Sequence, residues 1–196
     1  DRLHEYCSGV RQIIHEFKGT IQSTMFRGEA WYYLMVGQFL ERADNCLRQV
    51  EVLIQEELGG VSEDEVRSKN RLFLESIGAT LLLQNTDENF LADPNSIKRF
   101  LLCSVESPRC LLFCLEAIRR NLRELQQRYY PERNLSLETI NSFVERLRND
   151  RDDLQRKESF TDWVEELAEI SDEISEGLKT TLTDRTDETN RSFQTQ

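Results

Sequence analysis

The adjacent residues Glu41 and Arg42 lie in the longest helical pattern of the chain, residues 31–54, and their side chains could do chemistry. A carboxylate can act as a general acid or base, and a guanidinium, which is always charged, can clamp a carboxylate or a phosphate. Successive residues of a helix point about 100° apart, so the two side chains cannot share one small pocket without help from the helix edge. This geometry favours binding over catalysis.

Arg42 projects at the edge of the apolar stripe of this helix, one turn from Gln38 and one turn from Cys46. Burial of a guanidinium without a partner would cost several kcal/mol, so the sequence predicts a partner outside the helix. Two interpretations remain open: a buried ion pair that fixes how helices dock, or an arginine that binds a ligand. The stripe itself comprises Trp31, Met35, Phe39, Ala43, Cys46, Val50 and Leu53.

The turn that enters the same helix contains Arg27, Gly28 and Glu29. The positive end of a helix dipole favours an anion, and Arg27 adds to that local field. If any ligand binds to the chain, we expect it to contact a set of residues on this helix and its entry turn. That set is Arg27, Glu29, Glu41, Arg42 and Asn45.

The remaining sequence predicts an all-α fold, a single bundle of six to seven helices. The chain has 196 residues, of which 8 are Gly and 3 are Pro, and every apolar run has a period near that of a helix. The domain is expected to span 1–182, followed by a disordered tail at 183–196, where the apolar periodicity stops. The expected helices are 3–22, 31–57, 62–84, 94–103, 108–130, 136–154 and a last one from Ser159 or Thr161 to 182. Ser62 with Glu65 predicts a capping box for the third of these helices, and Ser107 with Pro108 predicts the cap of the fifth.

Composition excludes several classes of partner. The formal net charge is −11, which argues against binding of nucleic acid, and the one basic cluster, around Arg119 and Arg128, is interleaved with Glu116 and Glu124. No segment is apolar enough to span a membrane and no signal peptide opens the chain, so we expect a cytoplasmic protein. Because Asp1 lies almost inside the first helical pattern, we expect the chain to be part of a longer protein.

Metal and cofactor motifs are weak or missing. Cys103, Cys110 and Cys114 have apolar neighbours, which indicates small buried thiols in a reducing compartment, and their spacing fits no structural zinc pattern. His4 and His15 are about 16 Å apart along a helix, too far to share one metal. No glycine-rich nucleotide motif and no nucleophile elbow occurs, so we predict no cofactor.

Two blocks of this sequence form specific motifs. The first contains an R-x-E-x-W run at 27–31 and a G-x-x-x-E-R-A-D-N run at 37–45, and the second is FLLCSVESPRCLLFCLEAIRRNL at 100–122. Both blocks resemble the bacterial alpha-E family, a helical domain of unknown function, in which Asp and Ser usually stand at the positions of Ser104 and Cys110. The chain resembles the second of the two related halves of family members.

The resemblance implies a role in a bacterial peptide-forming or peptide-modifying system, because family members are typically encoded beside ATP-grasp-type ligases. The expected function is a non-catalytic binding or accessory module, whose partner is such a ligase or the missing first half of the domain. One alternative is a catalytic domain that uses Glu41 and Arg42 on an amide or carboxylate substrate. Another is a purely structural helical half-domain.

Overall fold

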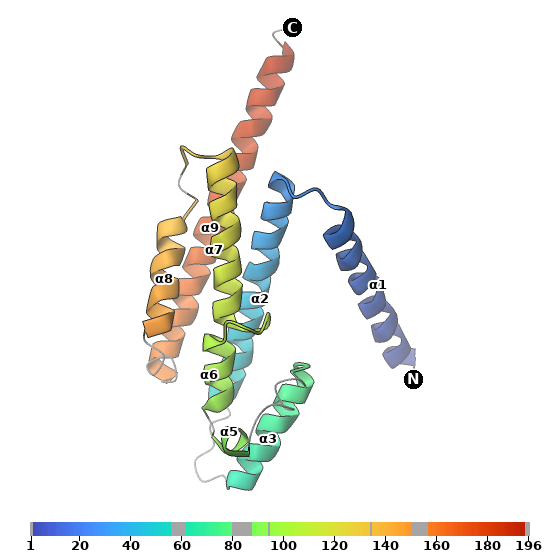
Figure 1. The fold of residues 1–196 in the computed structure, drawn as a ribbon, viewed down its shortest axis with the longest axis vertical. Helices are drawn as coiled ribbons and strands as arrows, with labels where there is room; N and C mark the ends of the chain where they lie inside the picture. The colour runs from blue at the N-terminus through green and yellow to red at the C-terminus, as the bar shows by residue number, and fades with distance from the viewer. Residues whose placement is uncertain are drawn as a thin grey trace.

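The computed structural model describes residues 2–55, 62–79, 88–93, 95–133, 135–149 and 157–194 (Figure 1). Within these ranges the chain forms eight helices and no strand, which confirms the predicted all-α fold; the short α5 adds one helix to the expected number. The helices are α1 (Arg2–Thr24), α2 (Glu29–Gln55), α3 (Glu63–Ser76), α5 (Glu88–Ala92), α6 (Ser96–Cys103), α7 (Leu111–Tyr129), α8 (Leu137–Asn149) and α9 (Lys157–Gln194).

The core of the protein lies between α2 and α7, which make the most extensive contact of any two helices. The helices are antiparallel, because Tyr32 near the start of α2 contacts Tyr129 at the end of α7, while Phe39 contacts Phe113 near the start of α7. Nine residues of α7 are buried, and all but Asn121 are apolar: Leu111, Leu112, Cys114, Leu115, Ala117, Ile118, Leu122 and Leu125.

Helix α8 packs against α7, and α9 packs against α2, which completes the bundle (Figure 1). Inside, the rings of Phe143 and Trp163 pack edge to face with their centres 5.0 Å apart. Outside, Arg146 of α8 pairs with Glu166 of α9. Helices α8 and α9 therefore meet through an apolar inner contact and a charged outer contact.

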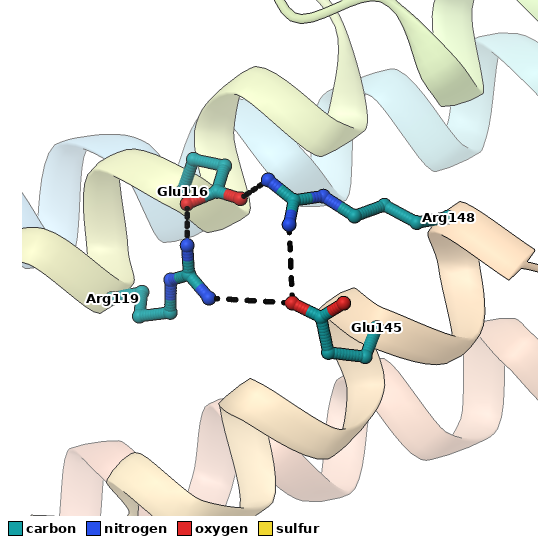
Figure 2. A network of polar contacts seen from close by, with 4 residues as sticks. All are labelled: Glu116, Arg119, Glu145 and Arg148. Atoms are coloured by element: carbon teal, nitrogen blue, oxygen red, sulfur yellow. Dashed lines mark hydrogen bonds and ion pairs between the residues drawn. The ribbon is translucent and has the colours of Figure 1, made fainter.

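A closed ring of four charges joins α7 to α8 (Figure 2). Glu116 accepts from Arg119 at 2.5 Å and also from Arg148. Glu145 lies 3.1 Å from Arg148 and 3.6 Å from Arg119. The basic cluster pairs with the glutamates interleaved in it: Arg119 pairs with Glu116 three residues before it, and Arg128 pairs with Glu124 four residues before it, at 2.8 Å.

Helices α3, α5 and α6 form the end of the molecule away from the C-terminus (Figure 1). The predicted capping box is confirmed: the side chain of Ser62 accepts from the backbone of Glu65, whose carboxylate accepts from the backbone of Ser62. The side chain of Asn70 on α3 donates to the backbone oxygens of Leu91 and Asp93, at 2.8 and 3.2 Å. One buried amide thus ties α3 to the α5–α6 connection.

Several helix ends differ from their expected positions. Helix α3 ends at Ser76 because Gly78, at φ +68°, adopts a left-handed conformation that closes the helix. Helix α7 begins at Leu111 with Cys110 as its N-cap, so Ser107 and Pro108 form a preceding turn instead of the expected cap. The expected segments 80–84 and 150–154 lie outside the described residues.

Helix α9 also differs from expectation, because it continues to Gln194, and so residues 183–194 of the predicted disordered tail are helical. No Gly or Pro occurs after Gly177, so nothing in the local sequence interrupts the helix even though its apolar pattern has stopped. This end of α9 extends beyond the other bundle helices (Figure 1).

Helix α1 leaves the bundle at an angle from the start of α2 (Figure 1). None of its 23 residues is buried. Among the described residues, no helix combines the length and the apolar character that crossing a membrane requires.

Candidate functional site

At the N-terminal end of α2, a chain of hydrogen bonds ends at Glu29. Tyr33, one turn along α2, donates to the hydroxyl of Tyr130 at 3.2 Å, and Tyr130 donates to Oε1 of Glu29. Burial raises the pKa of Tyr130 above its ordinary value, and the contact with Tyr33 raises it further. Burial likewise raises the pKa of Tyr33. Both phenols therefore stay protonated at neutral pH and act as donors toward the carboxylate.

Arg27 lies in the turn between α1 and α2 and contacts the end of α1. Its Nη2 donates to the backbone oxygen of Gln22 at 2.6 Å, and its guanidinium stacks over the ring of Trp31, 3.4 Å from the ring centre. The side chain is exposed, so the cation keeps contact with water. Arg27 links the last turn of α1 to the first turn of α2.

Arg42 lies at the edge between α2 and α7. Its guanidinium is 5.2 Å from the centre of the Phe39 ring. Burial raises the pKa of the Cys114 thiol to about 12, and the charge of Arg42 has a smaller effect that lowers this pKa. Within the described part of the chain Arg42 makes no ion pair. The side chain is only partly buried, so water reaches the charge that no carboxylate neutralises.

Glu41 points into a different environment from Arg42. It lines a groove of about 620 Å³ between α1 and α2, together with apolar residues that include Phe17, Ile21 and Leu34. Asn45, one turn further along α2, is exposed. The turn of about 100° between successive helical residues thus separates Glu41 from Arg42, as the sequence pattern indicates.

The five predicted site residues fall into separate places along α2. Glu29 and Arg42 are 13 residues apart on one continuous helix, which corresponds to about 20 Å. A small ligand cannot touch both groups at once. The five residues therefore form two separate groups, Arg27 and Glu29 at the turn that enters α2, and Glu41, Arg42 and Asn45 near its middle.

Sequence reasoning does not find the partners of these residues. Tyr130 is 101 residues from Glu29, and neither tyrosine belongs to a pattern that would link it to a carboxylate. Phe113 and Cys114, beside Phe39 and Arg42, are predicted only as core residues of their own helix. The antiparallel pairing of α2 with α7 creates both neighbourhoods, and local spacing carries no signal for that pairing.

The cysteines near Arg42 are buried thiols. None of the five cysteines forms a disulfide; Cys46, Cys110 and Cys114 are buried, Cys103 is partly buried and Cys7 is exposed. Burial raises the pKa of Cys110 to about 11 and that of Cys46 further. Among the described residues, no group of three or more His, Cys, Asp or Glu side chains is placed to hold a metal ion.

Comparison with protein families identifies the family of the chain. A family model, Alpha-E, described as a predicted alpha-helical domain with a conserved ER motif, matches residues 1–180. The chain belongs to the Alpha-E family. The Glu-Arg sequence occurs at 41–42, 132–133 and 145–146, and the first of these lies on α2, the central helix of the Alpha-E domain. No curated protein and no solved structure shows significant similarity to the chain.

Proposed function

We propose that this Alpha-E chain is a non-catalytic binding module in a bacterial peptide-forming or peptide-modifying system, where it docks an ATP-grasp-type ligase. The resemblance to alpha-E proteins supports the choice of partner. The sequence supports the absence of catalysis, because it contains no nucleotide-binding or nucleophile motif. The ATP chemistry would belong to the ligase.

The single observation that carries this proposal is the environment of Arg42. A partly buried guanidinium that forms no ion pair among the described residues is a ready partner for a carboxylate of another molecule. Its contact with Phe39 holds the planar group in place, so little side-chain freedom is lost on binding. A paired bidentate contact between arginine and carboxylate adds both energy and orientation.

The directions of Glu41 and Arg42 support binding over catalysis. Glu41 lines the groove beside α1, whereas Arg42 lies at the α7 side of the same helix. A general acid or base must lie within hydrogen-bonding reach of the group that the arginine clamps. The two side chains do not meet this condition around one small substrate, so the catalytic alternative lacks support from geometry.

The test is association with a purified ATP-grasp-type ligase, measured by isothermal titration calorimetry. Arg42→Met removes the charge and keeps most of the stem, and we expect binding to weaken by at least about tenfold. Arg48→Met is the matched control, because Arg48 lies on the same helix, 72% exposed and paired with Asp44 at 2.9 Å. We expect the control to bind like the unmodified chain. Equal binding by both variants would contradict the proposal.

A second measurement separates docking of the ligase from capture of its peptide substrate. A short peptide with a free C-terminal carboxylate and its amidated form differ only in the group that Arg42 would clamp. Docking of the ligase predicts that neither peptide competes with it. Competition by the carboxylate form alone, lost in Arg42→Met, would assign the site to the peptide.

A further inference from the structure

Helix α1 carries a row of exposed apolar side chains with the spacing of a coiled-coil seam. Leu3, Tyr6, Val10, Ile13 and Phe17 alternate at intervals of three and four residues, and between 38% and 76% of each side chain is exposed. Such spacing keeps one face of a helix against a partner helix over several turns. The face is wide, because Ile14, one position after Ile13, is also 45% exposed.

The exposed area of the chain is larger than that of a compact monomer. The accessible surface is 12779 Å² for a mass of 23.1 kDa, whereas the usual scaling with mass gives about 9,700 Å². The excess is about 3,000 Å². A specific interface removes about 800 Å² from each partner, so covering the apolar face of α1 fits well within this excess.

We propose that a second copy of this chain covers α1, with the two α1 helices packed antiparallel about a two-fold axis. A symmetric contact needs a surface that complements itself, and α1 provides one. With the axis near residues 11 and 12, Tyr6 faces the partner's Phe17, and Val10 faces the partner's Ile13. The four central residues of the row then meet apolar residues, whereas Leu3 lies opposite the partner's Thr20.

The groove between α1 and α2 fits the same arrangement. It is lined by Phe17 and Ile21 of α1 and by Leu34 and Met35 of α2. In the antiparallel register, the partner's Leu3 and the partner's Tyr6 lie opposite residues 20 and 17, beside this groove. The N-terminal end of one copy thus enters the apolar space of the other, and the contact is repeated on both sides of the axis.

Charge also favours α1 as the surface where two copies meet. The chain as a whole has a formal charge of −11, so most surfaces of two copies repel each other. Helix α1 has three basic residues, Arg2, Arg11 and Lys18, and two acidic residues, Glu5 and Glu16, so its own formal charge is +1. The α7 side of α2, where Arg42 lies, stays outside this contact.

The first test is the mass of the purified 196-residue chain in solution, measured by light scattering after size-exclusion chromatography across the micromolar range. We expect twice 23.1 kDa for the unmodified chain. Ile13→Glu places a charge at the centre of the seam in both copies, and we expect the dissociation constant to rise at least about 100-fold. Ile13 is 67% exposed in one copy, so the helix content by circular dichroism should not change.

The matched control is Leu72→Glu on α3, because Leu72 is 65% exposed, close to the exposure of Ile13. We expect this variant to remain dimeric. Phe17→Glu repeats the seam test at a second position and should also give the single-chain mass. A chain that stays at 23.1 kDa throughout, or dimers that persist in both seam variants, would overturn the proposal.

The second test concerns orientation and uses Cys7, the exposed cysteine of α1. In the antiparallel pair Cys7 lies near the partner's Ile14 and far from the partner's Cys7. Mild oxidation with diamide should therefore leave the unmodified dimer without a cross-link and should link Ile14→Cys dimers through Cys7 and the new thiol. Efficient linking of the unmodified chain through Cys7 would show a parallel pair and overturn the antiparallel arrangement.

Discussion

Helices α1 and α2 are neighbours in sequence, have similar lengths and are both amphipathic, yet their environments are opposite. Helix α2 buries Val36, Ala43 and Val50 completely against α7 and its neighbours, whereas α1 buries no residue. The apolar faces of both helices would be stabilised by burial, and among the described residues only α2 is buried in this way. An amphipathic pattern therefore predicts that a helix packs against something without showing which molecule supplies the contact.

The largest expected difference between the two regions is the cost of removing an aromatic ring. Phe143→Ala in the bundle leaves a cavity beside Trp163 and should lower the free energy of unfolding by about 3–5 kcal/mol. Phe17→Ala on α1 removes a ring that is 65% exposed and should change it by less than about 0.5 kcal/mol in the single chain. Urea denaturation at low protein concentration measures both. Similar losses would show that α1 belongs to the folded core of one chain.

The contrast between α1 and α2 also explains how far the sequence predicts the fold. The helical periods and the capping box at Ser62 and Glu65 are local, so the sequence predicts most helices and that cap. Cys110 in place of Ser107 as the N-cap of α7 was not predicted, because Ser107 followed by Pro108 has the usual composition of a helix start. Nor does any local pattern predict that α9 continues past residue 182, where its apolar periodicity stops, to Gln194.

The sequence also predicts only part of the candidate site. Arg42 is predicted at the edge of its helix from residue spacing alone, and that position is where the structure places it. Its neighbour Cys114 is 72 positions away, and Tyr130 is 101 residues from Glu29. These contacts depend on the antiparallel pairing of α2 with α7, which is set by the packing of whole apolar faces.

Removing one charge from the ring between α7 and α8 should have an intermediate effect on stability. Glu116→Gln removes the acceptor charge shared by Arg119 and Arg148, and we expect a loss of about 1–1.5 kcal/mol that diminishes at high salt. Glu16→Gln is the matched change on α1, where the carboxylate accepts a single exposed hydrogen bond from Gln12 at 2.8 Å. It should have almost no effect. Equal losses at low salt would remove the distinction between the ring and an ordinary surface pair.

The hydrogen bonds at the turn between α1 and α2 should make the stability of the folded chain depend on pH. The pKa of Tyr130 is raised in the folded chain, so its contribution to stability is complete below the ordinary tyrosine value of 10.0 and is lost as the pH rises above it. Tyr130→Phe should cost about 0.5–1 kcal/mol at neutral pH and should flatten the fall in stability above pH 10. Denaturation at a series of alkaline pH values measures this. An unchanged slope in the variant would remove Tyr130 as its source.

The smallest expected effect on stability belongs to Arg42, although its expected effect on binding is large. If Arg42 closed a buried ion pair, Arg42→Met would leave a carboxylate unpaired and would cost about 3–5 kcal/mol. The described residues provide no such carboxylate, and the methionine keeps the contact with Phe39, so we expect less than about 0.5 kcal/mol. Thermal denaturation beside Arg48→Met provides the comparison. A large loss confined to Arg42→Met would assign the arginine to the stability of the bundle, whereas two equally stable variants leave its charge available to a partner.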